Sequence, residues 1–299
     1  MSELEPLPEP DTAPLFAPLR EGLLALLREL APTDWDRPTV AGAWRVRDVV
    51  AHLLDGELRT LAAHRDRHDL APDAAVQGYA DVVALIQRLN AEGVAAGRHL
   101  SPRLLTDLLA VTGEWMSEFV ATLDPDAPAL FSVAWAGETE STNRFDTARE
   151  YTERWHHEMQ IRQAVGERGR PSILLVERLA VPLLETAVRV LPHVYRDLDA
   201  AAGTTLTFAA GTQETRGQAL TGLDVPSWAR QWTLYREGAV WLLYRGAATA
   251  PVARVSGSAD AWWRLFFNAL PASDAPRAFA TAGSDELVAP LWHARSVMV

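Results

Sequence analysis

The stretch REYTERWHHEMQIRQAVG (149–166) holds the residues from which the fold and the chemistry of the whole chain can be argued. Its pattern predicts a helix on which Glu153 and His157, four residues apart, share one face. A carboxylate and an imidazole in that arrangement can bind one divalent cation, as two histidines do in the HExxH motif. The same spacing is also typical of a helix that faces solvent, so this stretch alone leaves both interpretations open.

A third ligand is sought among the other histidines of the chain. His52 lies in VVAHLLDGE, where apolar neighbours on both sides predict a position inside a buried helix. Small residues on its stripe, Gly56 and Ala63, leave room for a ligand beside it. A hydrogen-bonded core histidine is the alternative. By contrast, His64 and His68 are flanked by Arg and Asp, which favours a solvated helix end.

Composition limits the classes of function. The chain of 299 residues has 48% hydrophobic residues, a formal net charge of -11 and no cysteine. The acidic balance argues against a nucleic-acid-binding protein. Without cysteine, a metal must be held by His, Asp or Glu, and any thiol chemistry needs an external sulfur. There is no signal peptide and no long apolar run, so we expect a cytoplasmic protein without a membrane segment.

The distribution of residues along the chain predicts an α+β protein. Leucine spacing and turn residues predict helices over 15–30, 45–66, 79–98, 101–123, 145–165 and 172–195. The composition then shifts toward short segments rich in Thr, Trp, Tyr, Leu and Val. Strands are expected over 205–211, 231–238 and 239–246, followed by helices over 258–270 and 284–297. We therefore expect a disordered tail over 1–12, a helical bundle over 13–197 and a small mixed α/β domain over 198–299.

The run GAWRVRDVVAHLLDGELR (42–59) resembles a segment of the DinB-like superfamily of helical bundles. Within that superfamily it is most similar to the N-terminal domain of the mycothiol-dependent maleylpyruvate isomerase family. TERWHHEMQ resembles the second signature of the family, with Gln160 where Asp is commoner, and Asn90 occupies a recurring Asn position. The C-terminal segments are similar to the small α/β domain that follows the bundle in this family.

The resemblance implies a four-helix bundle in which His52, Glu153 and His157 bind one divalent metal. Zinc is the metal that the family implies, although His and Glu ligands also accept nickel, iron or manganese. It further implies a low-molecular-weight thiol, such as mycothiol or bacillithiol, as cofactor. In the family reaction the thiol adds to an activated double bond of a small molecule, the bond rotates, and elimination gives the trans isomer. Related proteins transfer the thiol to electrophiles instead.

Several side chains are candidates for contact with the substrate or with the metal ligands. Arginines near the ligands can bind carboxylates through two parallel hydrogen bonds. Aromatic rings can line the wall of a pocket. The candidates are Asn90, Gln160, Arg59, Arg149, His156 and Trp155, with Trp44 as a second possible wall.

Two alternatives to a thiol-dependent isomerase or transferase remain open. The Trp-rich segments over 228–263 also fit a non-enzymatic protein that binds a lipid or another small molecule and carries a structural metal. A hydrolase that uses the same metal to activate water is the second alternative.

Overall fold

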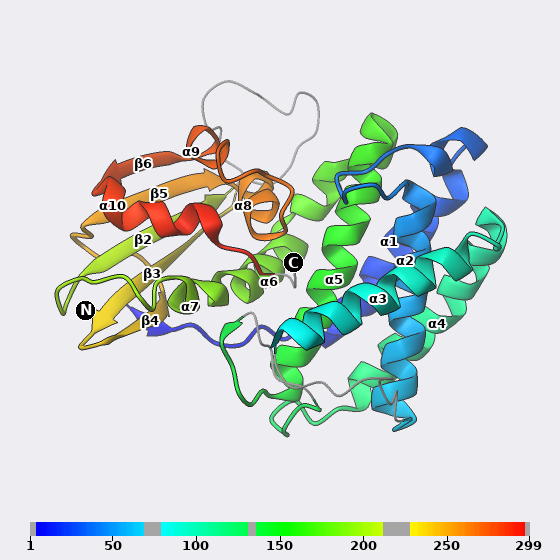
Figure 1. Ribbon diagram of the computed structural model, residues 1–299, viewed down its shortest axis with the longest axis horizontal. Helices are drawn as coiled ribbons and strands as arrows, with labels where there is room; N and C mark the ends of the chain where they lie inside the picture. Colours follow the sequence, from blue (N-terminus) through cyan, green and yellow to red (C-terminus); the bar gives the residue numbers. More distant parts are fainter. Residues whose placement is uncertain (1–3, 69–78, 131–135, 212–227, 297–299) are drawn as a thin grey trace. The chain divides into compact units, whose positions relative to one another are not determined.

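Contacts along the chain divide it into two units in a computed structural model that describes residues 4–68, 79–130, 136–211 and 228–296 (Figure 1). The helical unit comprises residues 11–132 and 140–171. The sheet unit comprises residues 1–10, 133–139 and 172–299. The order of helices and strands confirms the predicted α+β class, with the helical domain first.

Five long helices form the described part of the helical unit: α1 (Phe16–Glu29), α2 (Val46–Thr60), α3 (Tyr79–Gly97), α4 (Pro102–Thr122) and α5 (Asn143–Ala164). Helix α2 contacts α3, α4 and α5, and α1 contacts α4 and α5. The predicted N-cap of α4 is present, because Ser101 Oγ accepts a hydrogen bond from the Leu104 backbone N–H. Since α3 is a fifth long helix against α2, a four-helix bundle is not confirmed.

Apolar side chains of α1, α2, α4 and α5 fill the interior of the helical unit. Leucines of α1 and α4 meet Val46, Val49 and Val50 of α2, all three of which are completely buried. This packing fixes α2 against its neighbours. It thereby fixes the direction in which the side chain of His52, two residues after Val50, points from α2.

The sheet unit is built on one mixed sheet with strand order β1-β4-β3-β2-β5-β6. Its strands are β1 (Glu5–Pro6), β2 (Thr205–Gly211), β3 (Ala229–Glu237), β4 (Val240–Arg245), β5 (Ala253–Ser258) and β6 (Ala280–Gly283). Strands β3 and β4 form the predicted hairpin, and Gly238 takes a positive φ of 55° in its turn. Strands β5 and β6 were not predicted as strands, because they are short and rich in small or polar residues.

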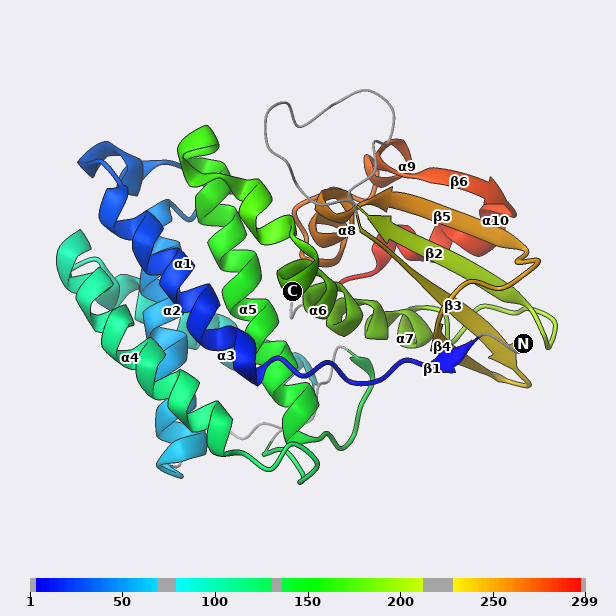
Figure 2. The same ribbon diagram turned by 180° about the vertical axis from the view of Figure 1, so that it is seen from behind.

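Helices cover one face of this sheet. They are α6 (Glu177–Ala187), α7 (Leu191–Val194), α8 (Ala259–Phe266), α9 (Ala275–Ala278) and α10 (Asp285–Val288). Both views show α10 on one side of the strands (Figures 1 and 2). The covered face carries Phe208 and Trp241, which meet Tyr195 after α7 in edge-on contacts with ring centroids 6.3 and 5.7 Å apart. Trp262 of α8 packs against Phe208 on the same face.

Two expected boundaries differ from the structure. The segment predicted as the last bundle helix, 172–195, belongs to the sheet unit, since α6 contacts α8 and α7 contacts β4. The expectation of a disordered tail over 1–12 is wrong for its described residues. Glu5 and Pro6 pair with β4, and Leu7 is buried. Proline is tolerated in β1 because β1 is an edge strand.

Candidate metal centre

His52 of α2 meets Glu153 and His157 of α5 at the packed face of these two helices. One ligand atom from each residue lies within 4.8 Å of the other two. His157 Nε2 is 3.6 Å from Glu153 Oε2. Two ligand atoms bound to one tetrahedral zinc at about 2.0–2.1 Å lie roughly 3.3 Å apart. The three side chains therefore fit a single divalent ion with only small movements.

Burial keeps the imidazole of His52 in its neutral form. His52 and His157 are 9% and 6% exposed, whereas the Glu153 side chain is 34% exposed. Burial, together with the neighbouring His157, lowers the pKa of His52 to about 3. The His52 ring is thus neutral at pH 7 and offers a lone pair to a metal.

The pKa of Glu153 is set by opposing effects. Burial raises the pKa, but interaction with His157 and the other nearby imidazoles outweighs it, so that the net shift is downward. Glu153 is therefore a carboxylate at neutral pH. Two imidazoles that each bind through a lone pair, together with one carboxylate, would leave a bound divalent ion with a net positive charge.

Gln160 orients the second histidine of the triad. Its Oε1 lies 2.8 Å from Nδ1 of His157. Because an amide oxygen only accepts hydrogen bonds, Nδ1 donates to it, and Nε2 is the nitrogen that faces Glu153. Gln160 thus supplies the acceptor that an Asp would supply, without the negative charge. This is a position where the sequence departs from the commoner pattern of the family it resembles.

His52 is held in a different way. Among the described residues neither ring nitrogen of His52 has a hydrogen-bond partner, and its Nδ1 is buried. Its ring instead lies between two others: the centroid of Trp44 is 4.9 Å away and that of His157 is 4.6 Å away. Trp44 also lies 6.2 Å from the His157 ring.

His156 is buried beside the triad. Its Nδ1 lies 2.8 Å from the Thr152 carbonyl oxygen, and its ring centroid is 3.9 Å from that of His157. Burial lowers the pKa of His156 to about 3. Neutral His156 packs on the His157 ring and does not belong to the group of three residues that could hold a metal.

Arg59 and Asn90 are brought together near His52. Arg59 Nη2 donates to Asn90 Oδ1 at 2.6 Å, and Arg59 Nε donates to Asp55 Oδ2 at 2.8 Å. The positive charge of Arg59 is close enough to lower the pKa of His52. The bond to Asn90 links α2 to α3, and the two bonds together fix the plane of the guanidinium group.

Two other predicted pocket residues have different surroundings. Arg149 Nη2 donates to Glu150 Oε1 at 2.5 Å and Nε donates to Asp146 Oδ1 at 3.2 Å, so two carboxylates hold the cation. Trp155 is completely buried, which is the position of a core residue, whereas Trp44 is half-buried.

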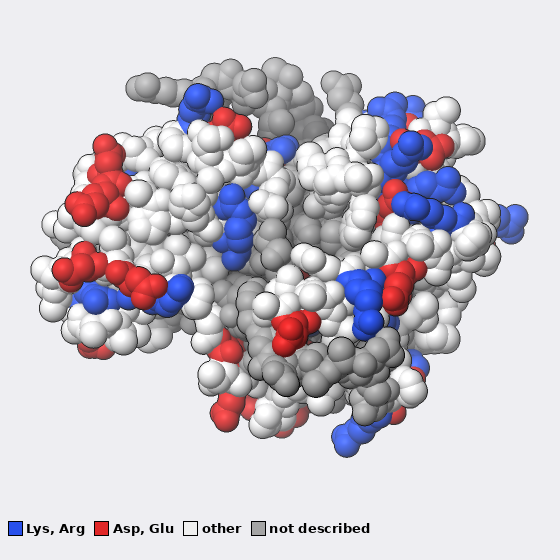
Figure 3. Space-filling model, in the orientation of Figure 1, with Lys and Arg blue, Asp and Glu red and all other residues white. Residues whose placement is uncertain are grey.

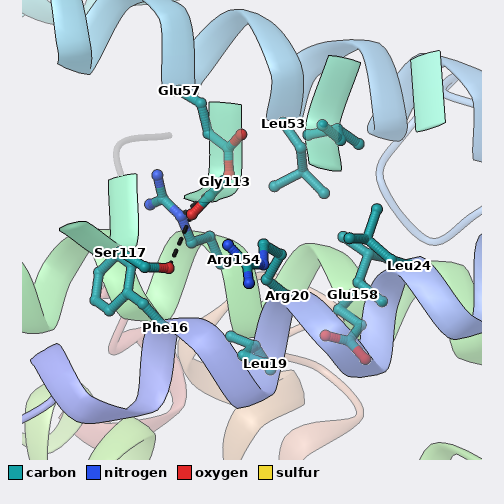
Figure 4. A pocket seen from close by; sticks show the side chains of 12 residues that line it. Phe16, Leu19, Arg20, Leu24, Leu53, Glu57, Gly113, Ser117, Arg154 and Glu158 are labelled. Carbon is teal, nitrogen blue, oxygen red and sulfur yellow. Dashed lines mark hydrogen bonds and ion pairs between the residues drawn. The ribbon is translucent and has the colours of Figure 1, made fainter. Parts of the chain in front are cut away.

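A second polar cluster lies inside the helical unit, and sequence reasoning missed it. A cavity of about 20 Å³, room for about one water molecule, is lined by Glu57, Arg154, Glu158, Arg20, Phe16 and Ser117, among others (Figure 4). Thr112 Oγ1 donates to Glu57 Oε2 at 2.5 Å, and Arg154 Nε lies 3.6 Å from Glu57 Oε1. Only the unusual number of charges on α5 hinted at this cluster.

Surface charges of the described residues are mixed in sign. Figure 3 shows Arg side chains beside acidic ones on the visible face of each unit. Arg103 and Asp107 on α4 are one such exposed pair, 3.7 Å apart. No helix among the described residues combines the length and apolarity needed to cross a membrane.

Comparison with known proteins finds one family that is similar to the helical unit. Residues 16–162 match the family described as the mycothiol maleylpyruvate isomerase N-terminal domain. The triad, Gln160, Asn90 and Arg59 all lie within the matched residues, and the resemblance stated from the sequence is confirmed.

Two solved structures are similar to the chain. One is a mycothiol-dependent maleylpyruvate isomerase, with 14% sequence identity, a TM-score of 0.46, and coverage of 87% of this chain and 88% of that chain. The other is a histidine-to-alanine mutant of such an enzyme, with 14% identity, a TM-score of 0.42 and the same coverage. None of the curated proteins matches the chain.

Proposed function

We propose that this protein binds one divalent metal, most simply zinc, through His52, Glu153 and His157. In our proposal it uses the metal with a low-molecular-weight thiol to isomerise or modify a small molecule in the cytoplasm. The observation that carries the proposal is the convergence of three ligand atoms from α2 and α5 within 4.8 Å of one another. The family that residues 16–162 match supplies the thiol, mycothiol or a related compound.

The donor set supports a catalytic metal. Structural zinc sites use four protein ligands, while catalytic sites use three and keep a position open. The exposed third of the Glu153 side chain provides an approach from solvent. When bound, the metal would lower the pKa of an incoming thiol, so that it reacts as the thiolate at neutral pH.

Residues of the chain would bind and orient the substrate. The bonds from Arg59 to Asp55 and Asn90 use its Nε and Nη2 atoms, which leaves Nη1 for an anionic group of the substrate. The alternative of a lipid-binding protein loses support from the sheet unit. The tryptophans that suggested a lipid site are buried in its core, with Trp232, Trp262 and Trp263 completely buried.

The direct test is metal analysis of the purified protein together with thiol-dependent turnover of a maleylpyruvate-like alkene. We expect about one equivalent of metal, and we expect turnover to require both metal and thiol. His157→Ala should lose the metal. His68→Ala is the matched control, since His68 is exposed on the same unit. Full turnover by the metal-free protein would contradict the proposal, and metal-dependent turnover of esters without thiol would favour the hydrolase.

A further inference from the structure

The two histidines of the triad are held by different kinds of contact. A hydrogen bond to Gln160 fixes the His157 ring. No described residue makes such a bond to His52, although the ring is 9% exposed and buried next to a charged carboxylate. Metal-binding histidines are commonly oriented by a partner on the nitrogen that does not bind the metal. Some other contact must therefore define the orientation of the His52 ring.

Trp44 makes that contact. Its ring lies over the His52 ring, with 4.9 Å between centroids and 43° between planes, and reaches the His157 ring as well. Contacts between aromatic rings at this separation contribute about 0.5–1.5 kcal/mol beyond the burial of area. The His52 ring is thus confined between the indole of Trp44 and the imidazole of His157.

The backbone that carries Trp44 is itself fixed. Pro38 and Arg45 form a β-bridge, and Gly42 takes a positive φ of 60° in the turn between them. Thr39 Oγ1 donates to the Trp44 carbonyl oxygen at 2.7 Å, and the Thr39 N–H donates to the same oxygen at 3.0 Å. Helix α2 begins two residues after Trp44. Trp44 and His52 are therefore joined by a short, ordered segment.

We propose that Trp44 is a positioning residue for His52. It does for this ligand by ring packing what Gln160 does for His157 by hydrogen bonding. Loss of the indole frees the His52 ring to turn and weakens metal binding. This inference rests on the proposed metal site, because Trp44 acts only through one of its ligands.

The test compares metal affinity in Trp44→Leu and Trp44→Phe by competition with a chromophoric chelator. Leucine fills much of the space without an aromatic face, whereas phenylalanine keeps one. We expect Trp44→Leu to bind zinc about 10–100-fold more weakly, the range for loss of an orienting partner. We expect Trp44→Phe to stay within about threefold of the wild type, since ring packing is retained. Trp115→Phe is the matched control, because Trp115 is 44% exposed on α4.

Two further measurements separate positioning from packing. The absorption spectrum of the cobalt-loaded protein reports the ligand geometry and should change in Trp44→Leu but not in Trp44→Phe or Trp115→Phe. The free energy of unfolding without metal reports packing alone. If Trp44→Leu is less stable without metal yet binds zinc within threefold of the wild type, Trp44 is only a packing residue and the inference is overturned. If the wild-type protein binds no metal, the proposed function fails, and the inference fails with it.

Discussion

Helix α5 carries two glutamates whose surroundings differ, although they are only five residues apart. Glu153 faces imidazoles, and its pKa is lowered despite burial. Glu158 faces the interior cavity, is 1% exposed, and burial raises its pKa to about 7 although Arg162 lies beside it. Burial alone therefore does not decide the protonation state of a carboxylate on this helix. The neighbouring side chains decide it: imidazoles surround Glu153, whereas Glu158 pairs with Arg162 of the same helix.

The same contrast explains why α5 is so polar for a buried helix. A helix that only packs would bury apolar residues, as α1 does with Leu19, Leu23 and Leu27. Helix α5 instead buries His156, His157, Glu158, Gln160 and Arg162. Sequences break local packing rules mainly at functional sites, and α5 breaks them over the turns that hold the triad.

The largest expected effect comes from removing the ligand carboxylate. Glu153→Gln keeps the shape of the side chain but removes the only negative charge of the donor set. We expect zinc affinity to fall by about 1,000-fold, more than the roughly 10–100-fold typical of an outer partner. Chelator competition measures the change. Glu158→Gln is the matched control on the same helix and should bind zinc within about threefold of the wild type. Equal affinities in the two variants would remove the distinction between the two glutamates.

The next largest expected effect is a loss of stability when Glu158 is replaced. Arg162 donates to Glu158 Oε1 through Nε at 2.7 Å, and both side chains are buried. Glu158→Ala leaves the guanidinium without its carboxylate, although it keeps bonds to the carbonyl oxygens of Gly22 and Gly169. We expect the free energy of unfolding to fall by about 3 kcal/mol, near the lower end for a broken buried pair. Urea denaturation measures it.

A double variant sharpens this expectation. In Glu158→Leu with Arg162→Met neither charge remains, so part of the lost stability should return. A double variant less stable than Glu158→Ala would mean that the two residues stabilise the helix independently.

The sequence predicts the residues of the triad but few of the contacts that hold their side chains in place. The spacing of Glu153 and His157 placed them on one face, and the apolar surroundings of His52 indicated burial. That Trp44 covers both imidazoles follows from how the loop over 38–45 folds back before α2, which depends on a bridge and a turn rather than on periodicity. The ion pair of Glu57 with Arg154 joins α2 to α5, which are far apart in sequence, so no local pattern could predict it.

The sheet unit was predicted only in part, because some of its strands depend on distant pairing partners. Alternating large residues identified β2, β3 and β4. Strand β1 joins β4 across nearly the whole chain, and the residues of β6, ATAG, are typical of a turn. Pairing partners, not intrinsic preference, make these segments strands.

Gln160 provides a smaller test of how the triad is held. Gln160→Leu removes the acceptor for His157 Nδ1 while keeping much of the volume. We expect zinc affinity to fall about tenfold, the lower end for an orienting partner, because His157 also packs against His52 and His156. Gln160→Asp restores an acceptor at this position and should recover most of the affinity. Unchanged binding by Gln160→Leu would show that ring packing alone orients both histidines.

The smallest effect is a dependence of stability on pH that originates in the cavity and not at the triad. Burial raises the pKa of Glu57 above its usual 4.5, against the opposing effects of Arg154 and Thr112. The folded protein therefore holds this proton at pH values where the unfolded chain has lost it. The stability contributed by Glu57 is complete below pH 4.5 and falls as pH rises through the folded pKa, by at most about 1.4 kcal/mol per unit.

Glu57→Gln tests this directly, because glutamine resembles the protonated acid and does not titrate. Urea denaturation at several pH values above 4.5 should show the variant gaining stability relative to the wild type as pH rises. His68→Ala should follow the wild-type profile. Parallel profiles for Glu57→Gln and the wild type would mean that Arg154 and Thr112 fully offset burial. Glu57 would then resemble Glu153, as a buried carboxylate kept charged by its partners, and the contrast between the cavity and the triad would rest on Glu158 alone.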